Sequence, residues 1–407
     1  MPNDIGNEIK VMWDDVASTT DINCTLSKSL NRFNMGEVEG ARTDDKVFEP
    51  QEFRFNVQDG LTSTDGDFQD LIDRMIPIDR TKVKRVLFKL SAKEMRDPRL
   101  LKMASEGIAR DIRNAIDVAA YETAIQEGSL VHTSAGAFEW QTASDVEVLM
   151  ANRGLGGYNK KAFLSLPDYS GVSQQLGAYQ YTDGIPKDAL TKAQLPMLQS
   201  FETIRADYRK TLAANTQTGV TINGDQSHTP QTYVTGSTTE FYDNRRMVLN
   251  VTTGTITNMP RGTKFTIAGV NALNPETRED AGELQTFTVL SGTVSALTIS
   301  PAIVTTGPYA NCSAIAGNTN AVVILNTTLS APSIFYTPES LILVPGQLPL
   351  GGAGVDEVVT TTENGIPLVM TMEKDFHTGD LHCKGVIYFD VVAKFPDRIV
   401  VCLTGQQ

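Results

Sequence analysis

The feature that most limits the fold of this chain is one long amphipathic helix, predicted over residues 97–128. Asp97 and Pro98 mark its beginning, because aspartate caps free amides and proline suits the first helical position. From Leu101 to Ala120 apolar residues recur at helical spacing. At 1.5 Å per residue such a helix is about 45 Å long, which is unusual in a globular protein. The residues predicted to lie largely off its apolar stripe are Arg110, Asp111, Arg113, Asn114 and Asp117.

Before this helix the chain shows an arm and a hairpin rather than a domain. Residues 1–40 contain isolated apolar residues and one short helix around residues 9–18, and most of these apolar side chains are expected to find partners on another surface. Residues 46–57 and 82–90 alternate on either side of an acidic stretch, which predicts a long hairpin within residues 41–96.

The charged groups of this hairpin are expected to pair within it, to pair with a neighbouring copy, or to remain solvated at a strand edge. They are Asp65, Asp67, Asp70, Arg80, Lys82 and Lys84.

After the helix two compositions follow one another. Short helices and strands alternate over residues 142–218, which is typical of an α+β body. From residue 218 to 330 threonine, valine, isoleucine, glycine and asparagine dominate six short alternating runs, which predict a separate β-barrel or sandwich. Longer β segments return over residues 331–407, and the chain shows no internal repeat.

The overall charge excludes several classes of function. Lys+Arg 35 against Asp+Glu 48 give a formal net charge of -13, the wrong sign for general nucleic-acid binding. No apolar run approaches the roughly 18 residues of a membrane span, and the amino-terminal residues lack a signal-peptide pattern, so we expect a protein that is cytosolic or assembled in the cytosol, without a membrane partner. The scattered Cys24, Cys312, Cys383 and Cys402 are expected to be reduced and partly buried.

Candidate chemistry is sparse. Gly154, Gly156 and Gly157 with two following lysines superficially resemble a phosphate loop, but the spacing is wrong and a turn is predicted instead. His377, Asp380, His382 and Cys383 match no zinc spacing, and adjacent residues of a strand point to opposite faces. We therefore expect no catalytic residues, no metal and no cofactor.

An ordered set of sequence stretches carries a resemblance that covers most of the chain. It consists of QEGSLVHT (126–133), TGVTINGDQSHTP (218–230), the triplet Asp243, Asn244 and Arg245, RGTKFTIAGV (261–270) and YANCSAIAGNTNAVVILN (309–326). The layout resembles the major capsid protein of tailed double-stranded-DNA bacteriophages, the Hong Kong 97 fold. More closely, it resembles the coat proteins of short-tailed Salmonella phages, which carry an inserted β-barrel.

The resemblance implies an α+β chain of this capsid type. Its implied parts are an N-terminal arm (1–40), an extended loop (41–96), a spine helix and peripheral domain with part of the axial domain (97–217), an inserted six-stranded barrel (218–330), and the axial domain with the β-hinge (331–407). It also implies a non-enzymatic homo-oligomer, with pentamers and hexamers of an icosahedral shell. That procapsid is assembled with a scaffolding protein in the host cytoplasm, carries a portal protein, and expands around packaged double-stranded DNA without sequence-specific binding.

Two groups of contact residues follow from the resemblance. Asp14 and Asp15 stand where the family presents acidic residues to a basic segment of the scaffold. The polar loop before Asp243, Asn244 and Arg245 stands where the inserted domain contacts its counterpart across a two-fold axis. Each group has an alternative: the two aspartates cap or solvate a helix, and the triplet makes a turn and an internal ion pair.

Other classes of function remain open from the sequence. A cellular nanocompartment shell of similar fold would enclose an enzyme rather than DNA. A carbohydrate-binding or adhesive protein would use the β domain alone. A hydrolase that uses His377, Asp380 or His382 is the most remote alternative.

Overall fold

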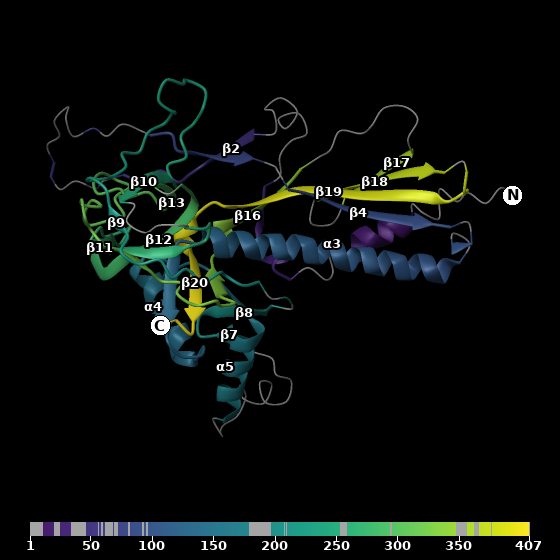
Figure 1. Ribbon diagram of the computed structural model, residues 1–407, viewed down its shortest axis with the longest axis horizontal. Helices are drawn as coiled ribbons and strands as arrows, with labels where there is room; N and C mark the ends of the chain where they lie inside the picture. Colours follow the sequence, from purple (N-terminus) through teal and green to yellow (C-terminus); the bar gives the residue numbers. More distant parts are fainter. Residues whose placement is uncertain are drawn as a thin grey trace. The chain divides into compact units, whose positions relative to one another are not determined.

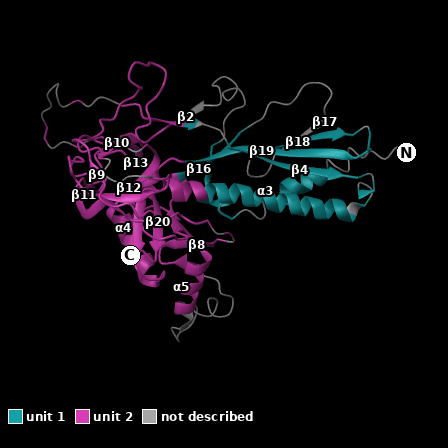
Figure 2. Ribbon diagram, viewed as in Figure 1, with its two compact units in different colours: residues 1–47, 78–121, 341–392 teal, residues 48–77, 122–340, 393–407 magenta. Residues whose placement is uncertain are grey.

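The fold was analysed in a computed structural model (Figure 1). It describes residues 11–19, 25–33, 46–55, 57, 60, 61, 68, 72–79, 82–91, 93, 94, 97–178, 197–206, 208, 210–252, 259–293, 295–346, 356–361, 366–375 and 377–406. The chain divides into two compact units (Figure 2). Unit 1 comprises residues 1–47, 78–121 and 341–392, and unit 2 comprises residues 48–77, 122–340 and 393–407.

The predicted long helix is confirmed as α3, Pro98–Glu127. Asp97 Oδ1 accepts a hydrogen bond from the Arg99 amide at 3.0 Å, which caps the first turn. The helix ends at Gly128, where a side chain has no room: a Cβ there would lie 2.7 Å from the Ala124 carbonyl and 2.9 Å from Ile399. Glycine is therefore required at the carboxyl end of α3.

Unit 1 contains a six-stranded sheet in the order β1-β16-β19-β18-β17, with β4 also paired to β19. The bounds are β1 Asn31–Arg32, β4 Lys82–Leu90, β16 Leu341–Pro345, β17 Asp356–Thr361, β18 Pro367–Lys374 and β19 Leu381–Ala393. Strand β4 runs antiparallel to β19, from Leu90 opposite Leu381 to Lys82 opposite Phe389. Residues 11–19 form the predicted helix of the arm, and η1, Ser27–Ser29, follows.

The predicted hairpin pairing is wrong in one respect. A two-stranded sheet exists, but β2, Lys46–Pro50, pairs with β3, Met75–Asp79, instead of with residues 82–90. Residues 82–90 form β4, whose partner comes from the carboxyl-terminal part of the chain. Alternation identifies a strand, but it contains no information on which other strand completes the ladder.

The body of unit 2 is a six-stranded mixed sheet with the order β5-β20-β15-β6-β8-β7. Its bounds are β5 Leu130–Ser134, β6 Lys160–Leu164, β7 Met197–Leu198, β8 Phe201–Arg205, β15 Ser333–Tyr336 and β20 Ile399–Thr404, with helices α4 Trp140–Asn152 and α5 Leu166–Ala178 and the short helices η4 Pro338–Ser340 and η5 Pro396–Arg398. Phe201 and Phe335 meet in its core with ring centroids 4.8 Å apart. The alternating helices and strands predicted for this region are confirmed. The glycine-rich segment forms the predicted turn, with Gly154 at φ +73.

All six predicted strands of the β domain are present in one sheet, in the order β14-β11-β12-β13-β10-β9. They are β9 Thr221–Ile222, β10 Met247–Thr252, β11 Lys264–Leu273, β12 Asp280–Gly292, β13 Ala296–Ser300 and β14 Val322–Ile324. The first and last strands also meet, because Thr221 bridges Ala321 and the Val322 amide donates to the Val220 carbonyl at 2.9 Å. This contact closes the sheet into a barrel around Phe265 and Phe287, which are fully buried.

The two ends of the inserted segment lie together. Leu212 and Ser330 form an antiparallel bridge in which the Leu212 amide donates to the Ser330 carbonyl at 2.8 Å. A second backbone hydrogen bond joins the same two segments closer to the barrel, where the Asn215 amide donates to the Asn326 carbonyl at 2.8 Å. The barrel is thus inserted into the body through a single paired stem.

Candidate functional site

The barrel holds the carboxyl end of α3 through a buried lysine. Lys264, the first residue of β11, is fully buried, and its ammonium group donates to the Gly128 carbonyl and, at 3.0 Å, to Thr288 Oγ1. Thr288 Oγ1 also donates to Gly128 at 2.8 Å. Burial holds the pKa of the Lys264 amine well below its usual value, although the Glu127 carboxylate opposes this effect. A hydrogen-bond donor at this position satisfies one of the carbonyls at the carboxyl end of the helix, where helices leave carbonyls unpaired.

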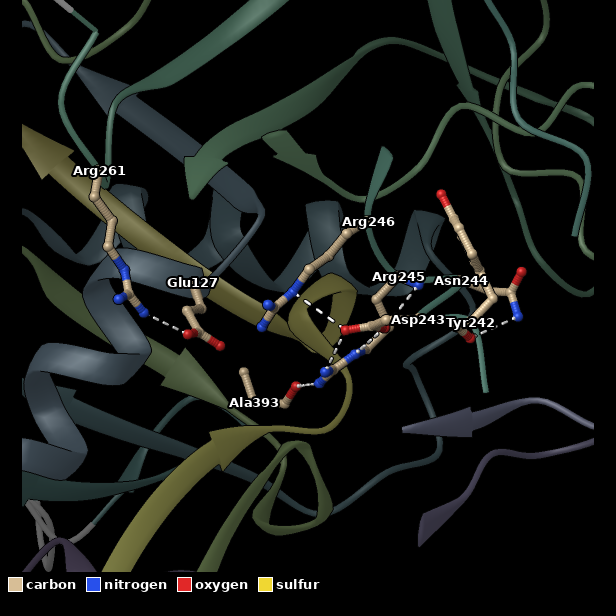
Figure 3. A network of polar contacts seen from close by, with 8 residues as sticks. All are labelled: Glu127, Tyr242, Asp243, Asn244, Arg245, Arg246, Arg261 and Ala393. Carbon is tan, nitrogen blue, oxygen red and sulfur yellow. Dashed lines mark hydrogen bonds and ion pairs between the residues drawn. The ribbon is translucent and has the colours of Figure 1, made fainter. Parts of the chain in front are cut away.

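A second contact lies beside the first. Arg261 Nη2 lies 2.6 Å from Glu127 Oε1, in the last residue of α3 (Figure 3). Thr286 of β12 donates from its hydroxyl to the Ser129 carbonyl at 2.5 Å. Three consecutive residues after and at the helix end are therefore held by side chains of the inserted domain.

The Asp243 network (Asp243, Arg245, Arg246 and Ala393) makes a separate attachment (Figure 3). Arg245 donates from Nε and Nη2 to the two carboxylate oxygens of Asp243, each at 2.8 Å, and Arg246 Nε lies 3.3 Å from the same group. Arg245 also donates from Nη1 to the carbonyl of Ala393, at the end of β19. This bidentate geometry is the strong form of an arginine–carboxylate pair, and it fixes the segment before β10 to residue 393.

The charges of this pair stabilise one another. Burial alone would raise the pKa of the Asp243 carboxyl, but Arg245 and its hydrogen bonds outweigh burial and hold the pKa below the usual value. Burial likewise opposes the charge on Arg245, yet Asp243 outweighs it and raises the pKa of the guanidinium. Both groups are therefore charged at neutral pH, and each depends on the other.

Asn244 closes the loop that precedes the pair. Its amide donates to the Gln231 carbonyl at 2.8 Å, and its Oδ1 accepts from the Gln231 amide at 2.9 Å. His228 Nε2 lies 3.2 Å from the same oxygen and its ring stacks on Tyr242. The side chain thus acts as a bridge between residues 228–231 and the Asp243 network.

These contacts change the interpretation of the predicted triplet. Asn244 and Arg245 are 5% and 6% exposed and Asp243 pairs inside the chain, so the internal ion pair, one of the two alternatives, is what the structure contains. Little of the triplet is accessible to another subunit. The preceding loop, residues 235–240, is largely exposed, and its contact across a two-fold axis stays a prediction.

The arm corrects a further expectation. Met12, Trp13, Val16 and Ala17 are buried within unit 1 rather than awaiting a partner surface. Trp13 lies against Gly385 of β19 so closely that a Cβ at position 385 would be 2.5 Å from the indole ring. The described part of the arm is therefore a component of its own subunit's core.

The two acidic residues of the arm helix have different surroundings. Asp15 accepts a hydrogen bond from the hydroxyl of Ser105, a buried residue of α3, at 2.7 Å. Asp14 is exposed. Asp15 thus has a structural contact of its own, and the predicted scaffold contact of both residues is untested.

Asp117 of α3 binds the segment that follows the arm helix, a role that was not predicted from the sequence. It was predicted to lie off the apolar stripe, yet it is buried. It is 2% exposed and accepts hydrogen bonds from the Thr25 amide and hydroxyl, both at 3.1 Å, and from the Ser27 amide at 2.9 Å. The signal was present in the sequence, because apolar residues surround Asp117 on all sides from Ala115 to Tyr121, a pattern of helices buried all round.

Strand β4 carries two of the predicted contact residues. Lys82 lies 3.1 Å from Asp390 of the neighbouring strand, whereas Lys84 is exposed. Lys89 pairs with Asp380 at 2.6 Å, which gives that member of the supposed metal cluster a structural partner. Asp65, Asp67, Asp70 and Arg80 lie outside the described residues.

Three features of the described residues bear on chemistry or on membranes: free cysteines, groups that could hold a metal ion, and helices that could cross a membrane. Cys312, Cys383 and Cys402 are free and buried, as predicted; burial raises the pKa of Cys312 to about 12 and of Cys383 to about 11. Cys24 lies outside the described residues. Among the residues with described positions, no group of three or more histidine, cysteine or acidic side chains is arranged to hold a metal ion, and no helix is long and apolar enough to cross a membrane.

Solved structures of several capsids are similar to this chain at a distance. A structure from Mycobacterium phage Che8 has 9% identity and a TM-score of 0.45, covering 93% of this chain and 90% of that one. The I-domain of the CUS-3 coat protein has 29% identity and a TM-score of 0.23, covering 28% of this chain and 99% of that one. A virus-like particle from Pyrococcus furiosus has 10% identity and a TM-score of 0.38, with 95% and 96% coverage.

The decisive similarity is one of sequence. The model of the family described as "P22 coat protein - gene protein 5" matches residues 1–405, almost the whole chain. That span includes the arm, α3, the inserted barrel and the sheet of the body. The chain therefore belongs to the P22 coat protein family, it has the Hong Kong 97-type capsid fold, and its function is that of a bacteriophage major capsid protein.

Proposed function

We propose that this capsid subunit assembles with a scaffolding protein into an icosahedral procapsid of pentamers and hexamers. The shell receives a portal protein, later expands, and encloses double-stranded DNA that it does not bind sequence-specifically. Assembly takes place in the host cytoplasm and the subunit performs no catalysis. The division into arm, extended loop, spine helix with peripheral domain, inserted domain and axial domain with β-hinge, at the boundaries given above, belongs to this proposal.

An exposed apolar segment in the extended loop carries the proposal. Phe53, Phe55, Val57 and Leu61 are exposed, with Val57 at 96%, although they lie within a few residues of one another. Apolar clusters of this kind on a soluble chain mark contact surfaces, and in a shell subunit the surface that covers them is a second copy. The family match supports a phage shell over the other two functions, a nanocompartment with enzyme cargo and a carbohydrate-binding β domain.

The test removes the apolar side chains without touching a core. In the double variant Phe53→Ser and Phe55→Ser we expect a folded subunit that no longer forms closed shells when coexpressed with its scaffold. Sedimentation velocity and negative-stain microscopy measure assembly, and circular dichroism measures folding. Val248→Ser, an equally exposed apolar position on β10, is the matched control and should assemble normally. Normal shells from the double variant would remove the extended loop from the mechanism.

The scaffold contact is proposed for the exposed side of the arm helix. An acidic group that meets lysine and arginine across a transient interface forms a contact that salt screens, which suits a partner that must later leave. Asp14 has the exposure this role requires, whereas Asp15 also supports α3. The exposed Lys84 and the charged residues Asp65, Asp67, Asp70 and Arg80 are proposed contacts between subunits.

Asp14→Ala should therefore weaken binding of the scaffold and reduce the salt dependence of that binding. Asp15→Ala should lower the melting temperature slightly, because the contact of the arm helix with Ser105 of α3 is lost while the Ser105 hydroxyl keeps the Lys102 carbonyl as an acceptor. Binding is measured by titration across a series of salt concentrations. If both variants bind the scaffold as the parent does at every concentration, another surface holds the scaffold.

The acidic balance of the chain supports containment of DNA without a grip on it. A formal net charge of -13 repels the phosphate backbone on average, so packaged DNA is not held against the wall by charge.

A further inference from the structure

Two buried arginines line one cavity of about 60 Å³ in unit 2. Arg153 follows α4 and is 6% exposed; Arg398 lies in η5 and is 3% exposed. Further walls come from the inserted barrel, including Gln285 of β12, and from the turn after α4. The cavity thus lies where three segments distant in sequence meet.

The guanidinium groups are not fully satisfied by the protein. Arg153 donates from Nη1 to Gln285 Oε1 at 2.8 Å, but its Nε and Nη2 have no hydrogen-bond partner among the described residues. Arg398 donates from Nη2 to Glu52 at 2.8 Å, while its Nη1 makes no hydrogen bond and lies 3.7 Å from Glu339. Buried donors without an acceptor destabilise a fold, so a ligand that brings acceptors to these groups stabilises it.

The charge on Arg153 has no close counterpart. Its one hydrogen-bond acceptor among the described residues is the neutral Gln285 amide, and burial lowers the pKa of the guanidinium, which Glu283 and Asp397 only partly oppose. An arginine nevertheless remains protonated in proteins. A neutral water molecule supplies an acceptor for such a group, but an anion supplies both the acceptor and the charge.

A second cavity of about 100 Å³ extends the same cationic character. It shares Arg54 and Asp397 with the first cavity and adds Arg74, whose guanidinium stacks over the Tyr309 ring at 4.2 Å. Arg74 Nε is buried without a hydrogen-bond partner among the described residues, and the carboxylate-bearing residues Glu52 and Asp397 line this second cavity as well. In a chain of net charge -13, the arginines in the linings of two adjoining cavities are a local concentration of positive charge.

We propose that the cavity between Arg153 and Arg398 binds phosphate in a protonated form. The oxygens of the phosphate accept hydrogen bonds from the two guanidinium groups, and its remaining O–H donates to Asp397, which lines the cavity together with a second acidic residue, Glu276. An ionised carboxylate is an acceptor only, so it favours a ligand that brings its own proton. Sulfate at neutral pH and the phosphodiesters of DNA have no such proton, and Asp397 repels them.

The expected effect of the ligand is on the folded state. Phosphate that touches the turn after α4, the barrel wall and η5 stabilises their contact by mass action, because the unfolded chain has no such site. Phosphate bound during assembly would therefore stabilise the contact between the inserted barrel and the body of unit 2. This proposal does not depend on the scaffold or on shell closure.

The experiment uses the full chain, dialysed free of phosphate. Equilibrium dialysis with radiolabelled inorganic phosphate should give one bound phosphate per chain. Thermal unfolding at pH 7 should show a rise in melting temperature on the order of 1–2 °C at several times Kd. Sodium sulfate and sodium chloride at the same ionic strength should have no such effect.

Two variants locate the site. Arg153→Gln should abolish saturable phosphate binding. Asp397→Asn, at a partly exposed position where folding is preserved, should let sulfate bind as well as phosphate, because an amide donates as well as accepts. Arg110→Gln, on the exposed face of α3, is the matched control and should leave phosphate binding unchanged.

Three results would overturn the proposal. Equal stabilisation by phosphate and sulfate in the parent protein would mean a general effect of anions. No bound phosphate would mean that water fills the cavity. Binding of adenosine monophosphate without binding of inorganic phosphate would mean a larger, open site rather than this cavity.

Discussion

Replacing Asp243 with alanine is expected to lower the free energy of unfolding by about 3–5 kcal/mol, as removal of one partner from a buried ion pair does. The reason is the charge left behind: Arg245 is 6% exposed, and without Asp243 its remaining partner is the neutral carbonyl of Ala393. Urea unfolding measures the loss, and hydrogen exchange in β10 to β13 shows whether it is confined to the barrel and its attachment.

The double variant Asp243→Ala with Arg245→Met separates the charge from the packing. It should be more stable than Asp243→Ala alone, because no buried cation remains without a partner. Acid should also lower the free energy of unfolding, as the Asp243→Ala variant does. The pKa of Asp243 is lowered in the folded state, so its contribution is present above the unfolded value of about 3.9 and is lost as the pH falls through the folded value. A single variant with the urea midpoint of the parent would show that this pair does not stabilise the fold.

Replacing Trp13 with alanine is expected to cost unit 1 about 3–5 kcal/mol, the range for a large aromatic residue removed from a core. Trp13 is fully buried and its ring lies against Gly385 of β19. The consequence is that loss of the arm is a defect of folding before it is a defect of assembly. Thermal unfolding and proteolysis of the arm measure the effect in the unassembled subunit.

A reciprocal pair of variants makes this test specific. Gly385→Ala alone should be destabilising, since its Cβ would lie 2.5 Å from the indole ring of Trp13. In the presence of Trp13→Ala that clash is absent, so the second change should cost little or partly fill the space. Val11→Ala, at a position 68% exposed in the same helix, is the control and should change stability little. Additive effects of Trp13→Ala and Gly385→Ala would contradict the contact.

The elements that could be predicted from the sequence were those with strong local signals. The start of α3 follows from Asp97 and Pro98, and the six strands of the barrel follow from alternation and turn residues. The pairing of β4 with β19 could not be predicted in this way, because almost three hundred residues separate the two strands and alternation is the same for any partner.

The candidate site also contains residues that could be predicted from local sequence and residues that could not. The Asp243, Asn244 and Arg245 triplet was identified from the sequence, and its internal ion pair was one of two interpretations. Lys264 was not identified, because a lysine at the start of a β run is normally an exposed residue; only the end of α3, which needs a donor at Gly128, explains its burial. Side chains that serve a distant element carry no local pattern.

The stem formed by Leu212 and Ser330 has a consequence for how the chain is connected. Joining the ends of a flexible loop costs entropy that grows with the logarithm of its length, and the residues between these two are numerous. Here the strand pairing of the closed barrel offsets that entropy. The paired stem holds together the two chain segments that lead from β8 and into β15. A change in the length of the barrel's outer loops therefore leaves the paired stem intact, whereas a change at Lys264 or Arg245 reaches the body directly.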